Sequence, residues 1–322
     1  MKSNFIISID FELIWGMHEG DIVNSNYNEN IKGGRKAIPA LLKLFEKYEI
    51  HATWAVVGLM FAENFEEAKK YFPPERMQPA YKNINMSPYP LIKQIDKCER
   101  DDTLYFAPDV IEQIGKADGQ EIASHTFSHF YCMEEGQTVE QFEADMIAAK
   151  AIASDKGYNL KTIVLPRDQC VKEYIDVLTK LGFTAYRDDY NDWIHKNIKF
   201  RSLLRILRMI DTYLPLTGFG GYIPRTDDGI YRLISSRMLR PYFKPLAFME
   251  KMKIKRIKKQ MLRAAKKGLT FHLWWHPHNI GTMTEYHLAM IEDILNYYVF
   301  LKKEYGMQSK NMAEVAEMCE NV

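Results

Sequence analysis

The stretch FIISIDFE, residues 5–12, places two carboxylates at the end of an apolar run. The apolar residues from Phe5 to Ile9 are typical of a buried strand. In an extended backbone, residues two apart point to the same face, so Asp10 and Glu12 can converge on one point. The alternative is that Asp10 caps a helix and Glu12 is solvated.

Short apolar runs rich in Ile, Val and Phe alternate with amphipathic stretches along the rest of the chain. This order predicts an α/β fold, with strand–helix units around a largely parallel sheet. Besides residues 5–9, the predicted strands are 52–57, 121–124, 162–165, 183–186 and 269–274. The predicted helices are 35–48, 109–116, 139–154, 171–181, 286–302 and 312–319.

We expect the 322 residues to form a single domain, residues 1–322, in which two segments break the alternation. Residues 71–105 contain the proline-bearing run FPPERMQPAYKNINMSPYP and are predicted to be an irregular insertion. Residues 199–267 are predicted to be a basic, mainly helical subregion. They hold 18 Lys or Arg against 4 Asp or Glu, a net charge of +14, which leaves −13 for the rest of the chain.

Two interpretations of the basic segment remain open. It can be a solvated helical surface over an acidic body, or it can face an anionic partner. That partner would be a phosphate-bearing substrate or a membrane surface, the latter through peripheral contact. The whole chain carries 43 Lys or Arg and 42 Asp or Glu, a formal net charge of +1, which argues against a general nucleic-acid binder.

The amino terminus does not resemble a signal peptide, because Asp10 and Glu12 interrupt its apolar run and no small-residue cleavage site follows. No uncharged apolar stretch of about 18 residues occurs, so no transmembrane helix is predicted. Four cysteines without a CxxC pair are predicted to be scattered thiols: Cys98, Cys132, Cys170 and Cys319. Together these features predict a cytoplasmic protein.

A second cluster, HTFSH at residues 125–129, follows the predicted strand 121–124. Histidines four apart on a helical turn lie close enough to share one divalent cation. His125, His129 and one carboxylate would leave a coordination position open for water, which is the ligand set of catalytic zinc. The alternative is that one histidine caps a helix and the other is partly buried.

A third cluster, FHLWWHPH at residues 271–278, ends the last predicted strand. His276 lies at the carboxyl end of that strand, where a general acid could reach a leaving group. His278 is either its neighbour in the site or exposed, and His272 is expected inside the strand as a hydrogen-bonded wall residue.

These clusters, in this order, resemble the NodB-type polysaccharide deacetylases of carbohydrate esterase family 4. HTFSH matches the family's H-(S/T)-x-x-H metal motif, and IISIDFE stands where the family has T-F-D-D. The departure resembles a D-x-E variant, which implies that Asp10 is the base and Glu12 a metal ligand. The resemblance spans roughly Phe5 to Asn279 and does not explain residues 199–267.

The resemblance also implies roles for further residues. LPRDQ at residues 165–169 is similar to the third motif, in which Arg167 would orient Asp10 through a charge-assisted bond. DYNDW at residues 189–193 is similar to the fourth motif, in which Trp193 would line the substrate groove, although it could equally be a loop. His276 would be the general acid, and Trp274 and Trp275 would form walls for a sugar ring.

By this resemblance, the fold is a distorted (β/α) barrel with one divalent ion held by Glu12, His125 and His129. Zinc suits these ligands best, and cobalt, nickel or iron would also fit. The implied function is a metal-dependent de-N-acetylase acting on an N-acetylated sugar or glycan precursor. The alternatives are hydrolysis of a non-sugar amide, cyclic imide or ureide, and a non-catalytic saccharide-binding protein on the same fold.

Overall fold

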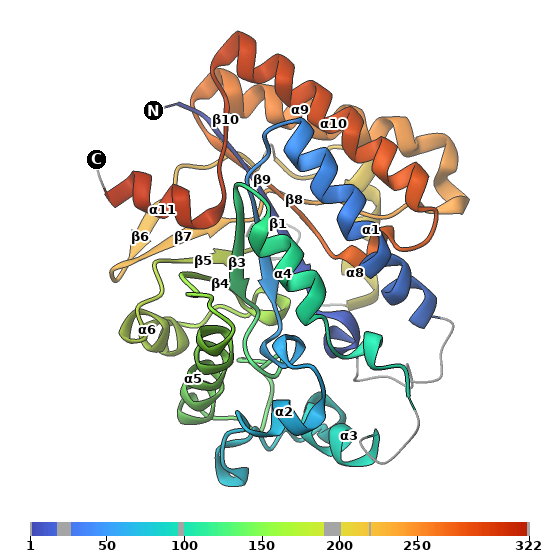
Figure 1. Cartoon of the computed structure of the whole chain (residues 1–322). Coiled ribbons are helices and arrows are strands. Elements are labelled where there is room, and N and C mark those ends of the chain that lie inside the picture. Colours follow the sequence, from blue (N-terminus) through green and yellow to red (C-terminus); the bar gives the residue numbers. More distant parts are fainter. Residues whose placement is uncertain (1, 18–26, 96–99, 190–200, 219, 321–322) are drawn as a thin grey trace.

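The computed structural model describes residues 2–17, 27–95, 100–189, 201–218 and 220–320, and a parallel sheet organises them (Figure 1). Strand β1 (Asn4–Phe11) lies between β2 (Ala52–Val56) and β9 (Thr270–Trp275). Beyond β2 follow, in order, β3 (Gln120–Ser124), β4 (Thr162–Val164), β5 (Ala185–Asp188), β7 (Ile230–Ile234) and β6 (Arg225–Asp227). Beyond β9 lies β8 (Arg237–Met238), and β10 (Gln308–Ser309) pairs with the amino end of β1.

The two ends of this sheet are joined by one continuous piece of chain. Strand β7 pairs in parallel with β5, and β8 pairs in parallel with β9. Only Ser235 and Ser236 separate β7 from β8, so the segment from Ile230 to Met238 bridges the two outer strands. The sheet is thereby closed into a distorted barrel, and the predicted fold class is confirmed.

Strands β6 to β8 lie inside the basic segment, residues 199–267, and the sequence did not predict them. That segment also contains α8 (Arg201–Tyr213) and α9 (Glu250–Lys267). The strands were missed because they are short and interrupted by cations, as in Arg232 of β7 and Arg237 of β8. Hydrophobic periodicity gives little signal over so few residues.

The helices follow the strands along the chain and cover the outside of the barrel. They are α1 (Asn28–Lys47), α4 (Pro108–Lys116), α5 (Val139–Asp155), α6 (Lys172–Lys180), α9 and α10 (Thr284–Tyr305). Figure 1 shows α1, α9 and α10 together on one side and α5 and α6 on the opposite side. Within the predicted insertion, the described residues 71–95 and 100–105 contain α3 (Pro88–Ile95) and short 3-10 turns, and α2 (Phe65–Lys69) precedes them.

Local sequence signals fix several helix ends. Helix α5 begins with a capping box, in which Thr138 and Gln141 each accept a hydrogen bond from the other's backbone N–H. Helix α9 ends at Gly268, whose φ of 64° is in the left-handed region that favours glycine. These ends set where the chain turns back toward the next strand.

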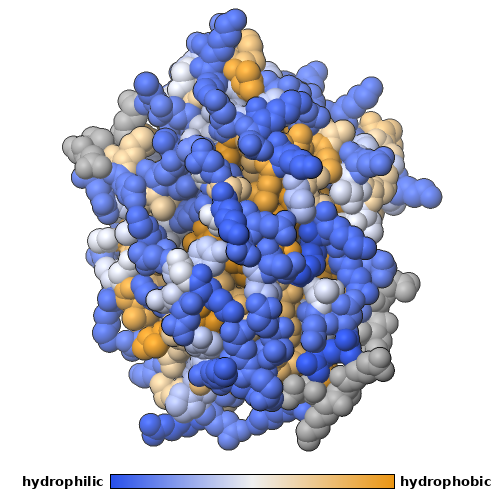
Figure 2. Space-filling view, viewed as in Figure 1, coloured by the Kyte–Doolittle hydropathy of each residue, from blue (hydrophilic) through white to orange (hydrophobic). Residues whose placement is uncertain are grey.

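The face of the molecule in Figure 2 is mainly hydrophilic, with apolar residues in scattered patches. None of the helices that the structure describes is long and apolar enough to cross a membrane.

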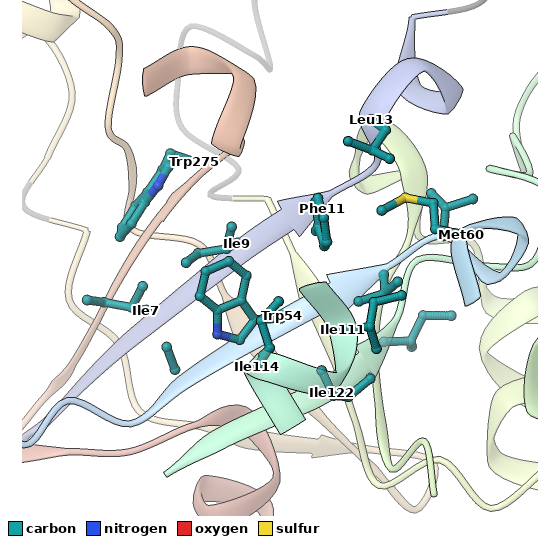
Figure 3. Packing of buried hydrophobic residues seen from close by; sticks show 14 of the residues in the cluster. Ile7, Ile9, Phe11, Leu13, Trp54, Met60, Ile111, Ile114, Ile122 and Trp275 are labelled. Atoms are coloured by element: carbon teal, nitrogen blue, oxygen red, sulfur yellow. The ribbon is translucent and has the colours of Figure 1, made fainter. Parts of the chain in front are cut away.

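Strand β1 alternates between two environments. Ile7, Ile9 and Phe11 point outward into the large core between the sheet and the helices, where they pack near Trp54 of β2 and Trp275 of β9 (Figure 3). The alternate residues point into the barrel, because successive side chains of a strand face opposite sides. The carboxylate of Asp10 is therefore directed inward.

Apolar side chains fill part of the barrel interior, and a helix covers its amino end. The small and aliphatic side chains form a second buried cluster, namely Ile6, Ala55, Val164, Ala185 and Leu233. Helix α11 (Met312–Glu320) packs on this cluster, with the Met312 N–H donating to Thr53 Oγ1 at 2.8 Å and the Ala313 N–H to Glu121 Oε2 at 3.1 Å. Polar groups at this end are few and bonded to one another, since Glu121 also accepts from the Thr53 and Thr162 hydroxyls at 2.7 and 2.6 Å.

Trp275 belongs to the outer core and not to a substrate wall. Its side chain is 0% exposed and lies edge-on to Phe45 of α1, with ring centroids 6.4 Å apart. The prediction that Trp275 contacts a sugar is therefore wrong. The reason is the alternation of β9, which sends Trp274 inward and Trp275 outward.

The Trp275→Ala variant should lower the free energy of unfolding by about 3–5 kcal/mol, because it leaves a cavity in the core. Phe300→Ala, on the exposed face of α10, serves as a control and should change it by less than about 0.5 kcal/mol. Chemical denaturation measures both. Equal effects of the two substitutions would contradict the placement of Trp275 in the core.

Candidate active site

Glu12 follows the carboxyl end of β1 and lies between two histidines. Its Oε2 is 3.3 Å from His125 Nε2 and 3.1 Å from His129 Nε2, and all three side chains are almost fully buried. Gly16 leaves room for this carboxylate, because a Cβ at that position would lie 2.0 Å from Glu12 Cδ. The three side chains form one group of metal-type donor atoms.

The two histidines come from a loop and not from a helical turn as predicted. The loop follows β3, and Thr126 and His129 have φ angles of 63° and 58°, which break any helix. The buried carboxylate of Asp145, on α5, accepts hydrogen bonds from the Phe127 N–H at 2.7 Å, the Ser128 N–H at 3.2 Å and the Ser128 hydroxyl. Burial raises the pKa of Asp145 to about 6, against the effect of these bonds.

The ring of His125 is oriented by the backbone of β4. Its Nδ1 donates to the Val164 carbonyl at 2.8 Å, which leaves Nε2 facing Glu12. Burial alone would lower the pKa of His125, but Glu12 and Asp10 raise it above the usual value. A cation and a proton therefore compete for the same nitrogen.

Histidines also determine the charge of Glu12. Burial alone would raise its pKa, but the charge of His276 and the hydrogen bonds from His125 and His129 hold the pKa well below its usual value. Glu12 is thus an anion at neutral pH, with one carboxylate oxygen directed at two imidazole nitrogens. This donor set fits a divalent cation without rearrangement of the loop.

Asp10 is held by a bidentate ion pair with Arg187, the last but one residue of β5. Arg187 Nη1 lies 2.6 Å from Asp10 Oδ1, and Nη2 lies 2.8 Å from Oδ2. Both side chains are buried. Burial alone would raise the pKa of Asp10, but Arg187, His276 and His125 hold it below its usual value.

The arginine that orients Asp10 is therefore Arg187, and the prediction of Arg167 for this role is wrong. Arg167 Nη1 pairs with Glu134 at 2.8 Å, and its guanidinium lies over the Tyr131 ring at 4.4 Å. The LPRDQ motif contributes its next residue instead, because Asp168 Oδ1 accepts from Arg187 Nε at 2.9 Å.

Arg187 is enclosed by further inward residues of the barrel. Its Nη1 donates to Ser8 Oγ at 3.0 Å, and Trp274 lies against its guanidinium at 4.3 Å. Trp274 is therefore directed into the barrel and packs on a buried cation. His272 Nε2 lies 2.8 Å from Ser8 Oγ, so His272 is the hydrogen-bonded interior residue that the sequence predicted.

His276 lies on the opposite side of Glu12 from the HTFSH loop. Its Nε2 is 3.5 Å from Glu12 Oε1 and 3.8 Å from Asp10 Oδ2, and its side chain is 20% exposed. His278 stacks on it with ring centroids 4.8 Å apart and is buried. Burial and the charge of His276 lower the pKa of His278 to about 3, so His278 is neutral at physiological pH.

The structure thus brings Asp10, Glu12, His125, His129 and His276 together at the carboxyl end of the barrel. Trp193 lies outside the described residues. Sequence reasoning missed Arg187, Asp168 and Ser8. The alternation of β5 could have identified Arg187, since an arginine that shares a strand face with Ala185 points into the interior and requires a carboxylate partner.

The family model for polysaccharide deacetylases matches residues 26–186, which is half of the chain. The chain belongs to the polysaccharide deacetylase family. The matched region contains the HTFSH loop but neither β1 nor β9, so Asp10, Glu12 and His276 are placed by the structure alone. No curated protein matches the sequence.

Solved structures share the fold of this family member at low sequence identity. A Mycobacterium smegmatis protein assigned as a polysaccharide deacetylase has a TM-score of 0.62 and 12% identity, over 99% of this chain and 91% of that one. One from Pseudomonas aeruginosa PAO1 has a TM-score of 0.57 and 13% identity, over 98% and 91%. PuuE allantoinase has a TM-score of 0.55 and 14% identity, over 99% and 91%.

The Gly16→Ala variant should weaken the binding of a divalent cation by roughly 10–100-fold, because the added methyl group displaces the carboxylate of Glu12. Gly221→Ala is the control, since its Cβ would meet the Leu269 side chain at 3.2 Å and Ala264 Cβ at 3.7 Å, away from the metal-type ligands. Zinc titration against a competing chelator measures both affinities. Unchanged affinity in Gly16→Ala would show that Glu12 is not a ligand.

Proposed function

We propose that this deacetylase family member removes an N-acetyl group from an N-acetylated sugar. The observation that carries the proposal is the buried Glu12, with two histidines on one side, His276 on the other and the ionised Asp10 beside it. A base, an acid and three metal-type ligands are the groups needed for metal-assisted amide hydrolysis.

Glu12, His125 and His129 would hold one divalent ion, for which we propose zinc. Two imidazoles and one carboxylate are a common catalytic zinc set, although cobalt, nickel and iron accept the same ligands. When bound, such an ion supplies Lewis-acid polarisation of the amide carbonyl and makes an adjacent water more acidic.

Asp10 acts as the general base in this proposal. Arg187 binds both of its oxygens, which fixes the carboxylate in position and favours its ionised form at neutral pH. Asp10 then accepts a proton as water attacks the acetyl carbonyl.

His276 acts as the general acid. Its Nε2 faces the same region as the two carboxylates, and its partial exposure gives a substrate access to it. Protonation of the amine nitrogen allows it to leave as a neutral amine and not as a poor anionic leaving group. The products are acetate and a free amino sugar.

The substrate class follows from the family, whose members are named for saccharides. We propose a sugar or glycan precursor inside the cell. The fold shared with an allantoinase makes a ureide or cyclic imide the second substrate class to test.

The deciding experiment measures acetate release from a panel of N-acetylated sugars by zinc-loaded wild type and His129→Ala. We expect about one zinc per chain and turnover in the wild type, and loss of both in the variant. Ammonia or ureide products from a parallel ureide panel, without acetate, would replace the sugar proposal. Sugar binding without turnover under any metal would indicate a non-catalytic protein.

The Arg187→Gln variant should lower kcat/KM by about 10²-fold or more, because Asp10 loses its orientation and its counter-charge. Arg167→Gln is the matched control and should stay within about fivefold, since an exposed ion pair contributes at most about 1 kcal/mol. Steady-state kinetics on folded, zinc-loaded proteins measure kcat/KM for both variants. A larger loss in Arg167→Gln would restore the role predicted from the sequence.

A further inference from the structure

Helix α8 presents an apolar stripe to solvent. Leu203, Ile206 and Ile210 are 42%, 57% and 38% exposed, and Leu214 and Leu216 directly after the helix are also exposed. The spacing of three and four residues places these side chains on one face of the helix. Surface helices of globular proteins normally turn such a stripe toward the core.

Polar side chains at its carboxyl end attach α8 to the protein. Asp211 is buried and pairs with Arg256 of α9 at 2.8 Å and with Arg237 of β8 at 3.1 Å. Tyr213, the last residue of α8, also contacts α9, because its hydroxyl donates to Glu250 Oε1 at 3.1 Å. The outward position of the apolar stripe is therefore fixed by buried ion pairs.

Cations and further apolar side chains accompany the stripe. Arg205 is exposed on α8, and Lys251 is exposed at the start of α9. Phe248 and Met252, which flank Glu250, are 80% and 41% exposed. The basic segment that contains all of these residues has a net charge of +14, whereas the rest of the chain is acidic.

Helix α8 lies at the same end of the barrel as the candidate active site. Arg208 Nη2 is 3.6 Å from Asp189 Oδ2, and Asp189 directly follows β5. Arg187, two residues before Asp189, holds Asp10. A surface that binds the apolar stripe would therefore lie next to the catalytic groups.

We propose that α8 docks this protein on an anionic lipid bilayer, and that its substrate is an N-acetylated sugar carried on a lipid in that bilayer. The second clause rests on the proposed function. Exposed aliphatic side chains together with cations are the composition of helices that lie in a membrane interface. Anionic headgroups attract such cations, whereas a second copy of this face would repel them.

Vesicle co-sedimentation tests the docking. We expect the wild type to bind vesicles of phosphatidylcholine with about 30% phosphatidylglycerol, to bind pure phosphatidylcholine weakly, and to lose binding as salt rises. Ile206→Glu/Ile210→Glu should lower the partition coefficient by about tenfold or more. Ile147→Glu, at a 53% exposed isoleucine on α5, is the matched control and should bind as the wild type does.

Equal binding by both variants, or no binding by the wild type, would overturn the docking. Light scattering of the proteins without vesicles tests whether a second copy of the chain covers the apolar stripe instead. A wild-type dimer that dissociates only in the α8 variant would overturn the bilayer proposal in favour of that second copy. Circular dichroism and thermal unfolding establish that each variant is folded.

Deacetylation assays test the lipid-linked substrate separately from membrane docking. The ratio of turnover on a lipid-linked N-acetyl sugar in vesicles to turnover on its water-soluble headgroup should fall in the α8 variant and not in Ile147→Glu. Unchanged ratios would overturn the lipid-linked substrate. No turnover of either substrate by the wild type, with vesicle binding intact, would overturn the proposed function and leave the docking.

Discussion

The buried ion pair between Arg187 and Asp10 is the interaction on which the interior of the barrel depends. An isolated charge in this environment would be strongly destabilised, so each partner is tolerated only because the other is present. Arg187 also binds Asp168 and Ser8 and packs on Trp274, which joins strands β1, β5 and β9 with the loop after β4. The same contacts that satisfy the guanidinium fix the position of the carboxylate proposed as the base.

Because strand side chains alternate in direction, the sheet has an apolar outer face and a partly polar inner face. Outward residues of β1 and β9, such as Ile9 and Trp275, form an apolar core with the helices. Inward residues such as Asp10 and Arg187 form a polar interior, which lies beside the smaller apolar cluster that contains Ile6. The residues of the candidate site can therefore be charged and buried without disturbing the packing that stabilises the fold.

Patterns of local sequence predicted much of this structure. The strands and helices from Phe5 to Tyr186 occur near their predicted positions, and the family resemblance is confirmed. The strands that close the barrel were missed, because β8 has two residues and its pairing with β9 is a long-range contact. The choice of Arg167 over Arg187 failed for a related reason. Motif spacing identified an arginine in a loop, whereas the direction of a strand side chain decides which guanidinium reaches Asp10.

The closure of the barrel also explains why the basic segment is part of the barrel that carries the candidate site and not an appended module. Its strands β7 and β8 complete the sheet, and Arg237 of β8 pairs with Asp211 of α8. Helix α8 is in this way anchored to the strand that pairs with β9, and β9 carries Trp274 and is followed directly by His276. The frame that anchors the apolar stripe is therefore also the frame that carries Asp10 and His276, so a partner bound at the stripe would be fixed relative to both side chains.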